Sequence, residues 1–385
     1  MNPLYADLPT TIFEKMSALA RETGAINLGQ GFPDAGWPRD VLEAGARALT
    51  DGYNQYPPMP GLPTLRQAVA DHYRRHQGID LDWQTEITVT SGATEALAAS
   101  IMALVSPGDE VLLIQPMYDA YLPMVRQAGG VPKLIRLEPP EWRLTEAVLA
   151  EAFTPRTRVV LLNNPLNPTA TMFSDEELTL LARFVVAHDA VVISDEVWEH
   201  VVFDGRAHSP IMAQPGMRER TVKIGSGGKI FSLTGWKVGW MCAAPKLSHA
   251  LARAHQFLTF TTPPNLQAAI AYGLGKDDAY FTAMRADFAR SRDRLASGLE
   301  AAGWKTLPSA GTYFLSVDLA ASGVSLDDVG FCDRLAREGD VVAIPVSAFY
   351  TETPVTSVVR FCFAKTDATV DAALERMAKA RKLFV

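Results

Sequence analysis

Hydrophobic positions in this chain gather in short runs that longer amphipathic stretches separate. The runs between residues 86 and 244 are almost continuously apolar, as expected of strands that are covered on both faces. They read EITVT, EVLLIQP, VPKLIRL, TRVVLLNNP, AVVISDEV, TVKIG and VGWMCAAP. Helical stretches separate several of them, and strands that alternate with helices predict an α/β domain with a mostly parallel sheet.

Three segments have the pattern of helices outside this set of strands. The clearest is residues 174–188, where Ser174 and Glu177 have the spacing of a capping box. The other two are residues 11–23 and 64–76. A further segment, SGATEALAASIMAL, runs directly from the first apolar strand into a helix.

After about residue 275 the pattern changes. A long polar helix is followed by TYFLSVDL, VVAIP and SVVRFCFA, with helices between them. This order predicts a smaller α+β domain. We therefore expect residues 1–45 to form an N-terminal arm and part of the small domain, residues 46–275 the large domain, and residues 276–385 the small domain.

Composition excludes several classes of protein. With 385 residues, of which 48% are hydrophobic, the chain can bury a large core. Its net charge is -7 and it has no basic stripe, so we expect no nucleic-acid partner. Its three cysteines form no CxxC pair, which argues against a disulfide framework or a structural zinc and favours the cytoplasm. We see no signal peptide and no apolar run of about 18 residues, so we expect no membrane span.

Candidate chemistry gathers after the predicted strands. In an open α/β sheet, ligands bind at the carboxyl ends of the strands. The segments at those ends are SGAT, PMY, NNPLNPT, SDEVW and GSGGK. Most of them are polar or rich in glycine, so we expect a ligand site at this edge of the sheet.

The segment Ser91–Thr94 has small residues at a helix start, where backbone N–H groups and the helix dipole would hold a phosphate. An ordinary capped helix remains the alternative. The usual nucleotide motifs fail, because Asp34 stands at the third glycine position of G-x-G-x-x-G and Lys223 at the first glycine position of the Walker motif. An anionic cofactor other than a nucleotide fits better.

Three charged residues have two interpretations each. Lys229 after a glycine-rich turn is either a desolvated lysine suited to Schiff-base formation or a surface lysine. Asp195, which ends an apolar strand, is either a helix cap or an anion that keeps a pyridinium nitrogen protonated. Arg360, within an apolar strand, is either an edge-strand residue that faces water or a fork for a carboxylate.

The run SGGKIFSLTGWKVGW, residues 226–240, closely resembles the cofactor-lysine signature of class I and II aminotransferases. These are fold-type I enzymes that use pyridoxal 5'-phosphate (PLP). Further motifs follow in the family's order along almost the whole chain: LGQGFPD, YNQYPPMPGLPTLR, SGATEAL, NPLNPT, ISDEV and VVRFCFA. The resemblance is strongest to the kynurenine, glutamine and methionine aminotransferase branch.

This resemblance implies a role for each matching residue. Lys229 would hold the cofactor and then move a proton, Asp195 would pair with the pyridine nitrogen, and Tyr118 would stack on the ring. Asn167 would bond the cofactor's 3'-oxygen and help to orient the substrate. The remaining implied cofactor-binding residues are Ser91, Gly92, Ala93, Thr94, Ser226 and Lys237, which would hold the phosphate.

The resemblance also implies a homodimer with shared active sites. Tyr56 would reach the cofactor phosphate of the neighbouring subunit. Arg360 would bind the substrate α-carboxylate, and the backbone at Gly31 would assist. No metal is implied.

The chain departs from the family pattern at two positions. Trp198 replaces the usual tyrosine; we expect its indole N–H to donate to the cofactor 3'-oxygen and to shift the pKa of the cofactor–lysine link. Ala170 replaces the glycine that ends the NPTG motif, and we expect the turn to differ because alanine tolerates positive φ poorly.

The reaction that the resemblance implies is ping-pong transamination between an amino acid and a 2-oxo acid. Phe32, Trp37, Tyr118 and Phe260 suggest an apolar pocket for methionine, aromatic or glutamine-like donors, although some of these rings are expected in the core. A carbon–sulfur β-lyase acting on cysteine conjugates needs the same groups and stays open. A PLP-binding regulatory module and a nicotinamide dehydrogenase fit less well, since the former's DNA-binding domain and the latter's glycine fingerprint are not seen.

Overall fold

The apolar runs of the first two-thirds of the chain form one sheet in the computed structural model, which describes residues 1–6 and 8–385. Its strand order is β2-β8-β7-β6-β5-β3-β4. The strands are β2 (Ile87–Ser91), β3 (Glu110–Gln115), β4 (Val131–Arg136), β5 (Thr157–Asn163), β6 (Val191–Asp195), β7 (Thr221–Ser226) and β8 (Val238–Cys242). β8 runs antiparallel to both of its neighbours, β2 and β7, whereas the other pairs are parallel, so the prediction of a mostly parallel sheet is confirmed.

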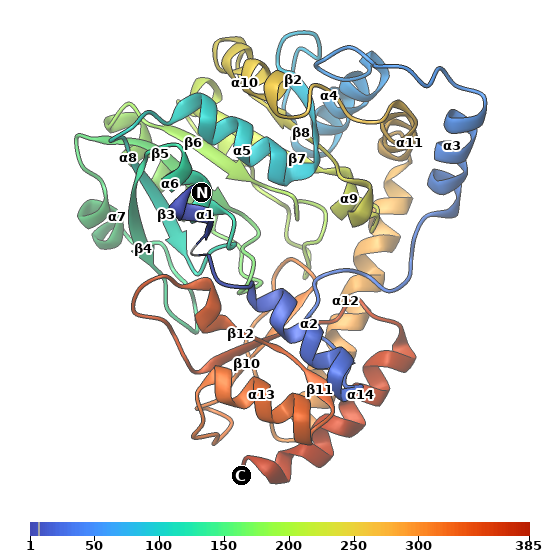
Figure 1. Cartoon of the computed structure of the whole chain (residues 1–385), viewed down its shortest axis with the longest axis vertical. Helices are drawn as coiled ribbons and strands as arrows, with labels where there is room; N and C mark the ends of the chain where they lie inside the picture. The colour runs from blue at the N-terminus through green and yellow to red at the C-terminus, as the bar shows by residue number, and fades with distance from the viewer. Residues whose placement is uncertain (7) are drawn as a thin grey trace.

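Helices cover both faces of this sheet (Figure 1). Successive residues of a strand point to opposite faces, and Val111 and Leu112 accordingly join different hydrophobic clusters. The first face is covered by α5 (Gly92–Leu104), α6 (Tyr121–Gln127) and α10 (Pro245–Leu258). The second is covered by α4 (Pro63–Gln77), α7 (Glu146–Ala152), α8 (Asp175–Ala187) and α11 (Pro264–Leu274).

Helix starts follow the capping residues that the sequence contains. Ser174 and Glu177 form the predicted capping box of α8, which satisfies two backbone N–H groups at the first turn. At the start of α2 (Ile12–Thr23), the Thr11 hydroxyl accepts a 3.2 Å hydrogen bond from the backbone N–H of Glu14. All three helices predicted outside the strand set are present.

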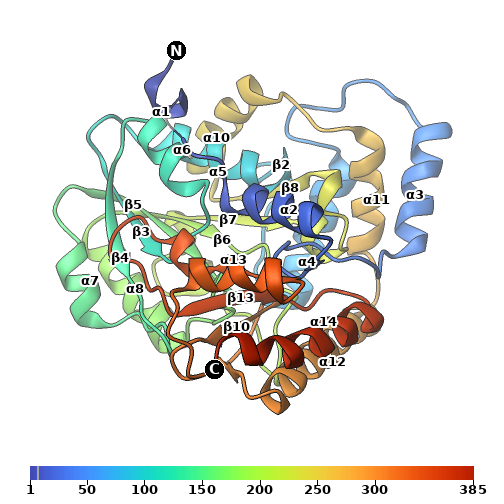
Figure 2. The ribbon, with the colours of Figure 1, turned by 60° about the horizontal axis from the view of Figure 1, so that its bottom comes forward.

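A second sheet, of order β12-β13-β10-β9, packs with the last helices at the other end of the molecule (Figures 1 and 2). Its strands are β9 (Lys305–Thr306), β10 (Phe314–Asp318), β12 (Ile344–Pro345) and β13 (Val358–Cys362). The helices are α12 (Asp278–Ala301), α13 (Asp328–Glu338) and α14 (Asp367–Ala380). In Figure 1, α12 runs from beside α11 down to α14 and so joins the two parts.

The N-terminal segment contacts both parts of the molecule. Strand β1 (Ile26–Asn27) pairs in parallel with β11 (Val341–Val342), whereas α3 (Arg39–Thr50) packs against α11. The predicted boundary at residue 45 falls inside α3. The domain boundaries at residues 45 and 275 stay a prediction. The remaining short elements are α1 (Pro3–Ala6), α9 (Gly227–Ile230), η1 (Ile211–Ala213), η2 (Arg218–Arg220), η3 (Thr234–Trp236), η4 (Val346–Phe349) and η5 (Arg381–Leu383).

Two findings bear on the expectations from composition. Across the described part of the chain, no helix has both the length and the apolar character that a membrane crossing requires. Cys242, Cys332 and Cys362 are buried and free.

Candidate active site

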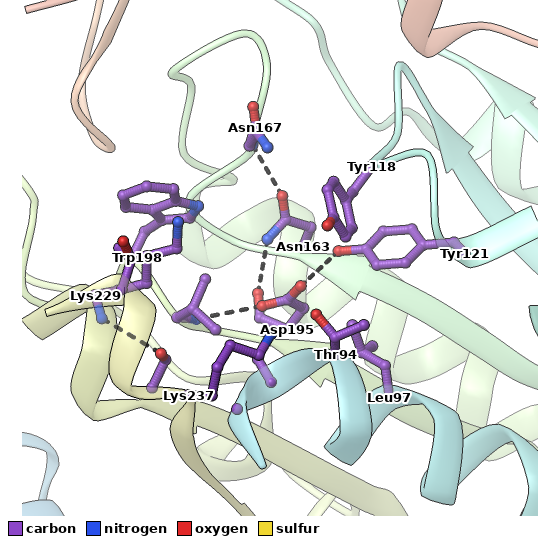
Figure 3. A pocket seen from close by; sticks show the side chains of 15 residues that line it. Thr94, Leu97, Tyr118, Tyr121, Asn163, Asn167, Asp195, Trp198, Lys229 and Lys237 are labelled. Carbon is purple, nitrogen blue, oxygen red and sulfur yellow. Dashed lines mark hydrogen bonds between the residues drawn. The ribbon is translucent and has the colours of Figure 1, made fainter. Parts of the chain in front are cut away.

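A cavity of about 230 Å³ lies where β5, β6 and β7 end against the first turn of α5 (Figure 3). Many predicted site residues line it: Gly92, Ala93, Thr94, Tyr118, Asn167, Asp195, Trp198, Ser226, Lys229 and Lys237. The other lining residues are Leu97, Tyr121, Asn163, Val197 and Thr234. The carboxyl ends of parallel strands meet at one edge of a sheet, and this explains why segments far apart in sequence converge here.

Lys229 lies in the short helix α9, which begins directly after β7. The Ser226 hydroxyl caps this helix by accepting a 3.3 Å hydrogen bond from the backbone N–H of Lys229. The Lys229 ε-amine donates to the Tyr313 hydroxyl at 3.3 Å and lies 4.7 Å from the centre of the Trp198 ring. Burial lowers the Lys229 pKa to about 8, despite the opposing effect of Asp195. A useful fraction of the amine is therefore neutral, and nucleophilic, near neutral pH.

Asp195 is the last residue of β6 and is buried. Its Oδ2 accepts a 2.6 Å hydrogen bond from the Tyr121 hydroxyl, and its Oδ1 accepts a 3.4 Å bond from the backbone N–H of Val197. Burial raises the Asp195 pKa, while the hydrogen bond from Tyr121 and that from Val197 act in the opposite direction. A buried carboxylate of this kind gains most from a cationic partner, such as a protonated ring nitrogen.

The first turn of α5 faces the ammonium group of Lys237. Gly92 has a φ of 72°, and a Cβ there would lie 3.3 Å from the Lys237 Nζ, so the glycine makes room for this group. Ser91, the N-cap residue, makes no side-chain cap bond, which leaves the first N–H groups of the helix available. Helix N–H groups and a lysine together suit a phosphate. Ser91 itself lies outside the cavity lining, and its N–H donates to Glu95 Oε2 at 2.8 Å.

Two aromatic side chains border the cavity on different sides in Figure 3. Burial, followed by the nearby Asp119 and Asp195, raises the Tyr118 pKa to about 12, so its phenol is neutral. Trp198 is 3% exposed and packs edge-on against Tyr313, with ring centres 4.3 Å apart. Flat rings on two sides leave a space that suits a planar cofactor.

Arg360 lies in β13 and is buried, so it is not an edge-strand residue that faces water. One guanidinium nitrogen donates to Asn167 Oδ1 at 2.7 Å, and the other terminal nitrogen donates to the Gly29 carbonyl at 3.1 Å. The guanidinium carbon lies 3.8 Å from the centre of the Phe314 ring. Burial lowers the Arg360 pKa to about 10, which still leaves the group cationic at neutral pH.

Arg360 and Gly31 lie just outside the cavity lining but are joined to it by hydrogen bonds. Arg360 reaches it through Asn167, and the Gly31 carbonyl accepts a 2.5 Å bond from the Tyr313 hydroxyl that also contacts Lys229. The small sheet and the N-terminal segment therefore contribute to one site with the large sheet.

Other predicted site residues are not brought to this cavity within the chain. Tyr56 is 81% exposed and packs edge-on against Phe260, with ring centres 5.6 Å apart. Phe32 and Trp37 line a different cavity, beside residues 232–236. The four rings expected to form an apolar substrate pocket therefore do not line one cavity within the described part of the chain: Tyr118 lines the active-site cavity, Phe32 and Trp37 line another, and Phe260 packs against Tyr56.

The Ala170 turn contradicts the sequence expectation. Ala170 has a φ of 62°, the left-handed conformation that alanine was expected to avoid. Its carbonyl accepts hydrogen bonds from the backbone N–H groups of Ala310 at 2.8 Å and Gly311 at 3.0 Å, and these bonds hold the strained conformation.

Sequence reasoning missed three polar residues of the site. Tyr121 follows Tyr118 by three residues in PMYDAY, and Asn163 opens the NNP segment after β5. The Asn163 amide donates to the Asp195 carbonyl at 2.9 Å, and its oxygen accepts from the Asn167 N–H at 2.9 Å. Tyr313, in GTYF, lies in the distant small sheet region, and no local pattern points from it to Lys229.

These groups fit PLP part by part. Lys237 and the start of α5 suit the phosphate, and Asp195 suits the ring nitrogen. The rings of Tyr118 and Trp198 suit contact with the planar pyridine ring. Lys229 supplies the amine that a PLP enzyme needs.

Comparisons with known proteins agree with this chemistry. A family model described as aminotransferase class I and II matches residues 23–377. The chain is 44% identical over 379 residues to the "Probable N-succinyldiaminopimelate aminotransferase DapC" of Mycobacterium tuberculosis, covering 96% of this chain and 95% of that protein. It is 42% identical over 370 residues to the methionine aminotransferase of Escherichia coli, covering 96% of each.

Solved structures match equally well. The N-succinyldiaminopimelate aminotransferase from Mycobacterium tuberculosis superposes with a TM-score of 0.95 at 44% identity, over 98% of this chain and 99% of that chain. All residues that line the cavity fall within the span that the family model matches. The chain therefore belongs to the class I and II aminotransferases, and it is a PLP-dependent aminotransferase of fold type I.

Proposed function

We propose that this aminotransferase takes the α-amino group from an amino acid with an uncharged side chain, such as methionine, an aromatic amino acid or glutamine, and gives it to a 2-oxo acid. The observation that carries this proposal is the charge of the cavity. Among the described residues that line it, the only cations are Lys229 and Lys237, and no arginine is present. Arg360, just outside the lining, reaches it through Asn167 and is the arginine assigned to the α-carboxylate. A side-chain carboxylate would therefore lack a second arginine in the lining as its bidentate partner.

The names of the relatives support this range but do not agree on one donor. The Escherichia coli relative is named for methionine, and a Rattus norvegicus relative, 35% identical over 405 residues, is named a kynurenine–oxoglutarate transaminase. The Mycobacterium tuberculosis relative is named for N-succinyldiaminopimelate, which carries additional carboxylates. We include that compound in the test as a rival donor.

Each residue that touches the cofactor has a proposed task. Lys237, Ser226 and the N–H groups of Gly92, Ala93 and Thr94 would hold the phosphate. Asp195 would pair with the ring nitrogen, Tyr118 would stack on the ring, and Asn167 and Trp198 would donate to the 3'-oxygen. When bound, PLP supplies an electron sink that makes the substrate Cα–H acidic.

The protein moves the proton and holds the substrate. The neutral ε-amine of Lys229 would accept the proton from the substrate Cα and hold it for the transfer that completes transamination. Arg360 binds the α-carboxylate, and the Gly31 backbone assists. Phe13, Phe314 and Phe349 surround the Arg360 guanidinium at 5.5, 3.8 and 5.1 Å, which excludes water and strengthens this ion pair.

We also propose that the active unit is a homodimer. Tyr53 and Tyr56 are 82% and 81% exposed, although a tyrosine normally buries much of its ring. A neighbouring subunit would cover this segment, and Tyr56 would reach its cofactor phosphate. Residence in the cytoplasm remains a prediction.

Initial rates with a set of amino donors test the substrate proposal. We expect kcat/KM for methionine, phenylalanine or glutamine to exceed that for aspartate by on the order of 100-fold, since one missing charge-assisted pair costs about 3 kcal/mol. Good activity with aspartate and none with methionine or phenylalanine would contradict the proposal. A clear preference for N-succinyldiaminopimelate would also contradict it, and pyruvate plus ammonia from a cysteine conjugate without an acceptor would indicate a β-lyase.

A further inference from the structure

A second cavity, which shares no lining residue with the active site, lies on the face of the large sheet that α4 covers. Its volume is about 360 Å³. It is enclosed by the end of α4, the segment of residues 199–208 that follows Trp198, and the first half of α12. We call it the basic cavity, because five basic side chains line it: His76, His200, Arg206, His208 and Arg285.

The two arginines of the basic cavity have no acidic partner. Within the described residues, neither Arg206 nor Arg285 forms an ion pair within 4.0 Å of a carboxylate oxygen. The one hydrogen bond of the Arg285 side chain goes to the Thr282 hydroxyl at 3.3 Å. By contrast Arg292, on the same helix, binds Asp204 at 2.8 Å. Two carboxylates outside the lining offset part of the positive charge: Asp278 lies 3.8 Å from His76 Nε2, and Arg292, together with the charge of Arg206, lowers the pKa of Asp204. Neither of them forms an ion pair with Arg285.

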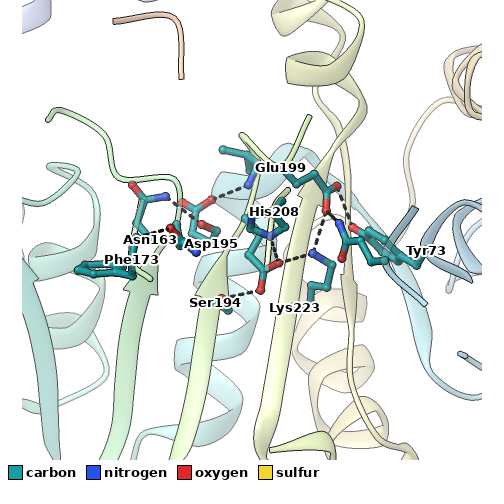
Figure 4. A network of polar contacts seen from close by, with 12 residues as sticks. Tyr73, Asn163, Phe173, Ser194, Asp195, Glu199, His208 and Lys223 are labelled. Atoms are coloured by element: carbon teal, nitrogen blue, oxygen red, sulfur yellow. Dashed lines mark hydrogen bonds and ion pairs between the residues drawn. The ribbon is translucent and has the colours of Figure 1, made fainter. Parts of the chain in front are cut away.

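Glu199 is the one acidic residue among the described residues that line the basic cavity, and both of its carboxylate oxygens already accept hydrogen bonds. Glu199 is buried and accepts hydrogen bonds from the Lys223 ammonium at 2.8 Å, the Gln77 amide at 2.6 Å and the Tyr73 hydroxyl at 3.2 Å (Figure 4). It has little capacity left to repel an anion or to attract a cation.

A metal cation does not suit this place. Glu196, Glu199 and His208 have ligand atoms within 4.8 Å of one another, which is a spacing that a metal ion could use. However, the Lys223 ammonium binds both carboxylates. Lys223 and His208 together outweigh burial and lower the Glu196 pKa to about 2. The Lys223 ammonium would repel an added cation, whereas it would attract an added anion.

The basic groups around His200 also indicate that this cavity favours an anion over a cation. Apart from burial, the pKa of His200 is lowered by His76, Arg285, His208 and Lys223, all of which are cationic when protonated. In addition, the buried Nδ1 of His208 has no hydrogen-bond partner, while its Nε2 contacts Glu196 at 2.6 Å. Because the pKa values of His200 and His76 are lowered, first of all by burial, both imidazoles are mainly neutral at neutral pH, and the positive charge of the lining comes from Arg206 and Arg285. The cavity thus combines two guanidinium groups with an unused buried polar atom of His208.

We propose that the basic cavity binds a small oxyanion with two negative charges, of which inorganic phosphate is the simplest. Arg285 and Arg206 act as guanidinium donors to its oxygens, and the histidines complete the shell. The bound anion links α4, residues 199–208 and α12. This site is separate from the phosphate site of the cofactor, and it does not depend on which amino acid the enzyme uses.

Calorimetric titration of the PLP-saturated holoenzyme with phosphate, at constant ionic strength kept with chloride, tests the proposal. PLP fills the active-site phosphate position, so added phosphate reports on another site. We expect one site, weakened on the order of tenfold by Arg285→Gln and by Arg206→Gln, because each variant removes a charge-assisted hydrogen bond to the anion. Arg253→Gln on α10 is the matched control and is expected to leave the affinity unchanged, since Arg253 lies outside the basic cavity and its side chain donates to Gln256 Oε1 at 3.3 Å.

Succinate in place of phosphate shows whether the site selects a tetrahedral oxyanion, and in either case the affinity must fall in the Arg285→Gln variant. Crystals of the holoenzyme soaked with tungstate give an independent readout through anomalous density. We expect a peak in the basic cavity. Binding that neither arginine variant weakens, no binding beyond that of chloride, or a peak at Arg360 alone would overturn the proposal.

Discussion

The Tyr121 hydroxyl donates a 2.6 Å hydrogen bond to Oδ2 of Asp195, and both side chains line the cavity. The two residues come from α6 and β6, which are far apart in sequence and meet at the edge of the sheet. Asp195 is the one carboxylate among the described residues that line the cavity. Because burial raises the Asp195 pKa and this bond lowers it, Tyr121 helps to keep Asp195 ionised.

Tyr121→Phe is therefore expected to raise the Asp195 pKa and to weaken its hold on the cofactor nitrogen. We expect kcat to fall by on the order of tenfold, as for the loss of one hydrogen bond to a charged group. Steady-state kinetics and the Kd of PLP measure the effect. Tyr350→Phe is the matched control, since it removes a 2.7 Å bond from a hydroxyl to the Leu137 carbonyl away from the cavity. Equal effects of the two variants would contradict this role.

The Lys229 amine should titrate well below an ordinary lysine in the cofactor-free protein. Burial lowers its pKa to about 8, whereas a lysine in an unfolded chain has a pKa of about 10.4. Competitive labelling of amines, followed by mass spectrometry of the Lys229 peptide, should give a midpoint near pH 8. A midpoint at or above pH 10 would show that the amine is not desolvated.

The same shift predicts how stability depends on pH. Between pH 8 and about 10.4 the unfolded chain holds more protons at this residue than the folded protein, so the free energy of unfolding of the cofactor-free protein rises with pH across this window. Below pH 8 both states are protonated and the contribution is constant. Lys229→Met should lack this rise when urea unfolding is compared at pH 8 and pH 10. An identical rise in both proteins would contradict the assignment.

Arg360→Lys should not behave as a conservative change, because a lysine cannot reproduce the two-nitrogen contact with a carboxylate. We expect kcat/KM for methionine to fall by on the order of 100-fold. The amine that lacks the carboxylate, 3-(methylthio)propylamine, should react poorly with both proteins and at nearly equal rates. A similar fall for both donors would mean that Arg360 acts through packing and not through the α-carboxylate.

Trp198→Tyr tests the departure from the family pattern. A tyrosine hydroxyl can donate, accept and ionise near the cofactor 3'-oxygen, whereas the indole N–H only donates. We expect the spectral pH titration of the holoenzyme to shift its midpoint by about one unit, which corresponds to 1.36 kcal/mol. An unchanged titration would contradict a hydrogen bond from Trp198 to that oxygen.

Much of the large sheet was predictable because its strands are buried on both faces and therefore read as apolar runs. The antiparallel direction of β8 was not, since an apolar run carries no information about direction. The pairing of β1 with β11 was missed because each strand has two residues and the contact spans the whole chain.

The active site was predictable where a strand end and a family motif coincide, as at Asp195 and Lys229. Tyr313 could not be predicted, because its contact with Lys229 depends on how the small sheet packs against the large one. Ala170 shows the opposite error: a local preference against positive φ was overridden by two backbone hydrogen bonds from the neighbouring segment.

The absorbance spectrum of the purified protein, before and after methionine is added without any 2-oxo acid, tests directly whether this chain is a PLP enzyme that accepts methionine. We predict a yellow protein whose long-wavelength band bleaches as the cofactor takes up the amino group, and Lys229→Ala should not support catalytic turnover. A protein that shows no such band even after PLP is added would contradict the assignment of Lys229 as the cofactor-binding residue.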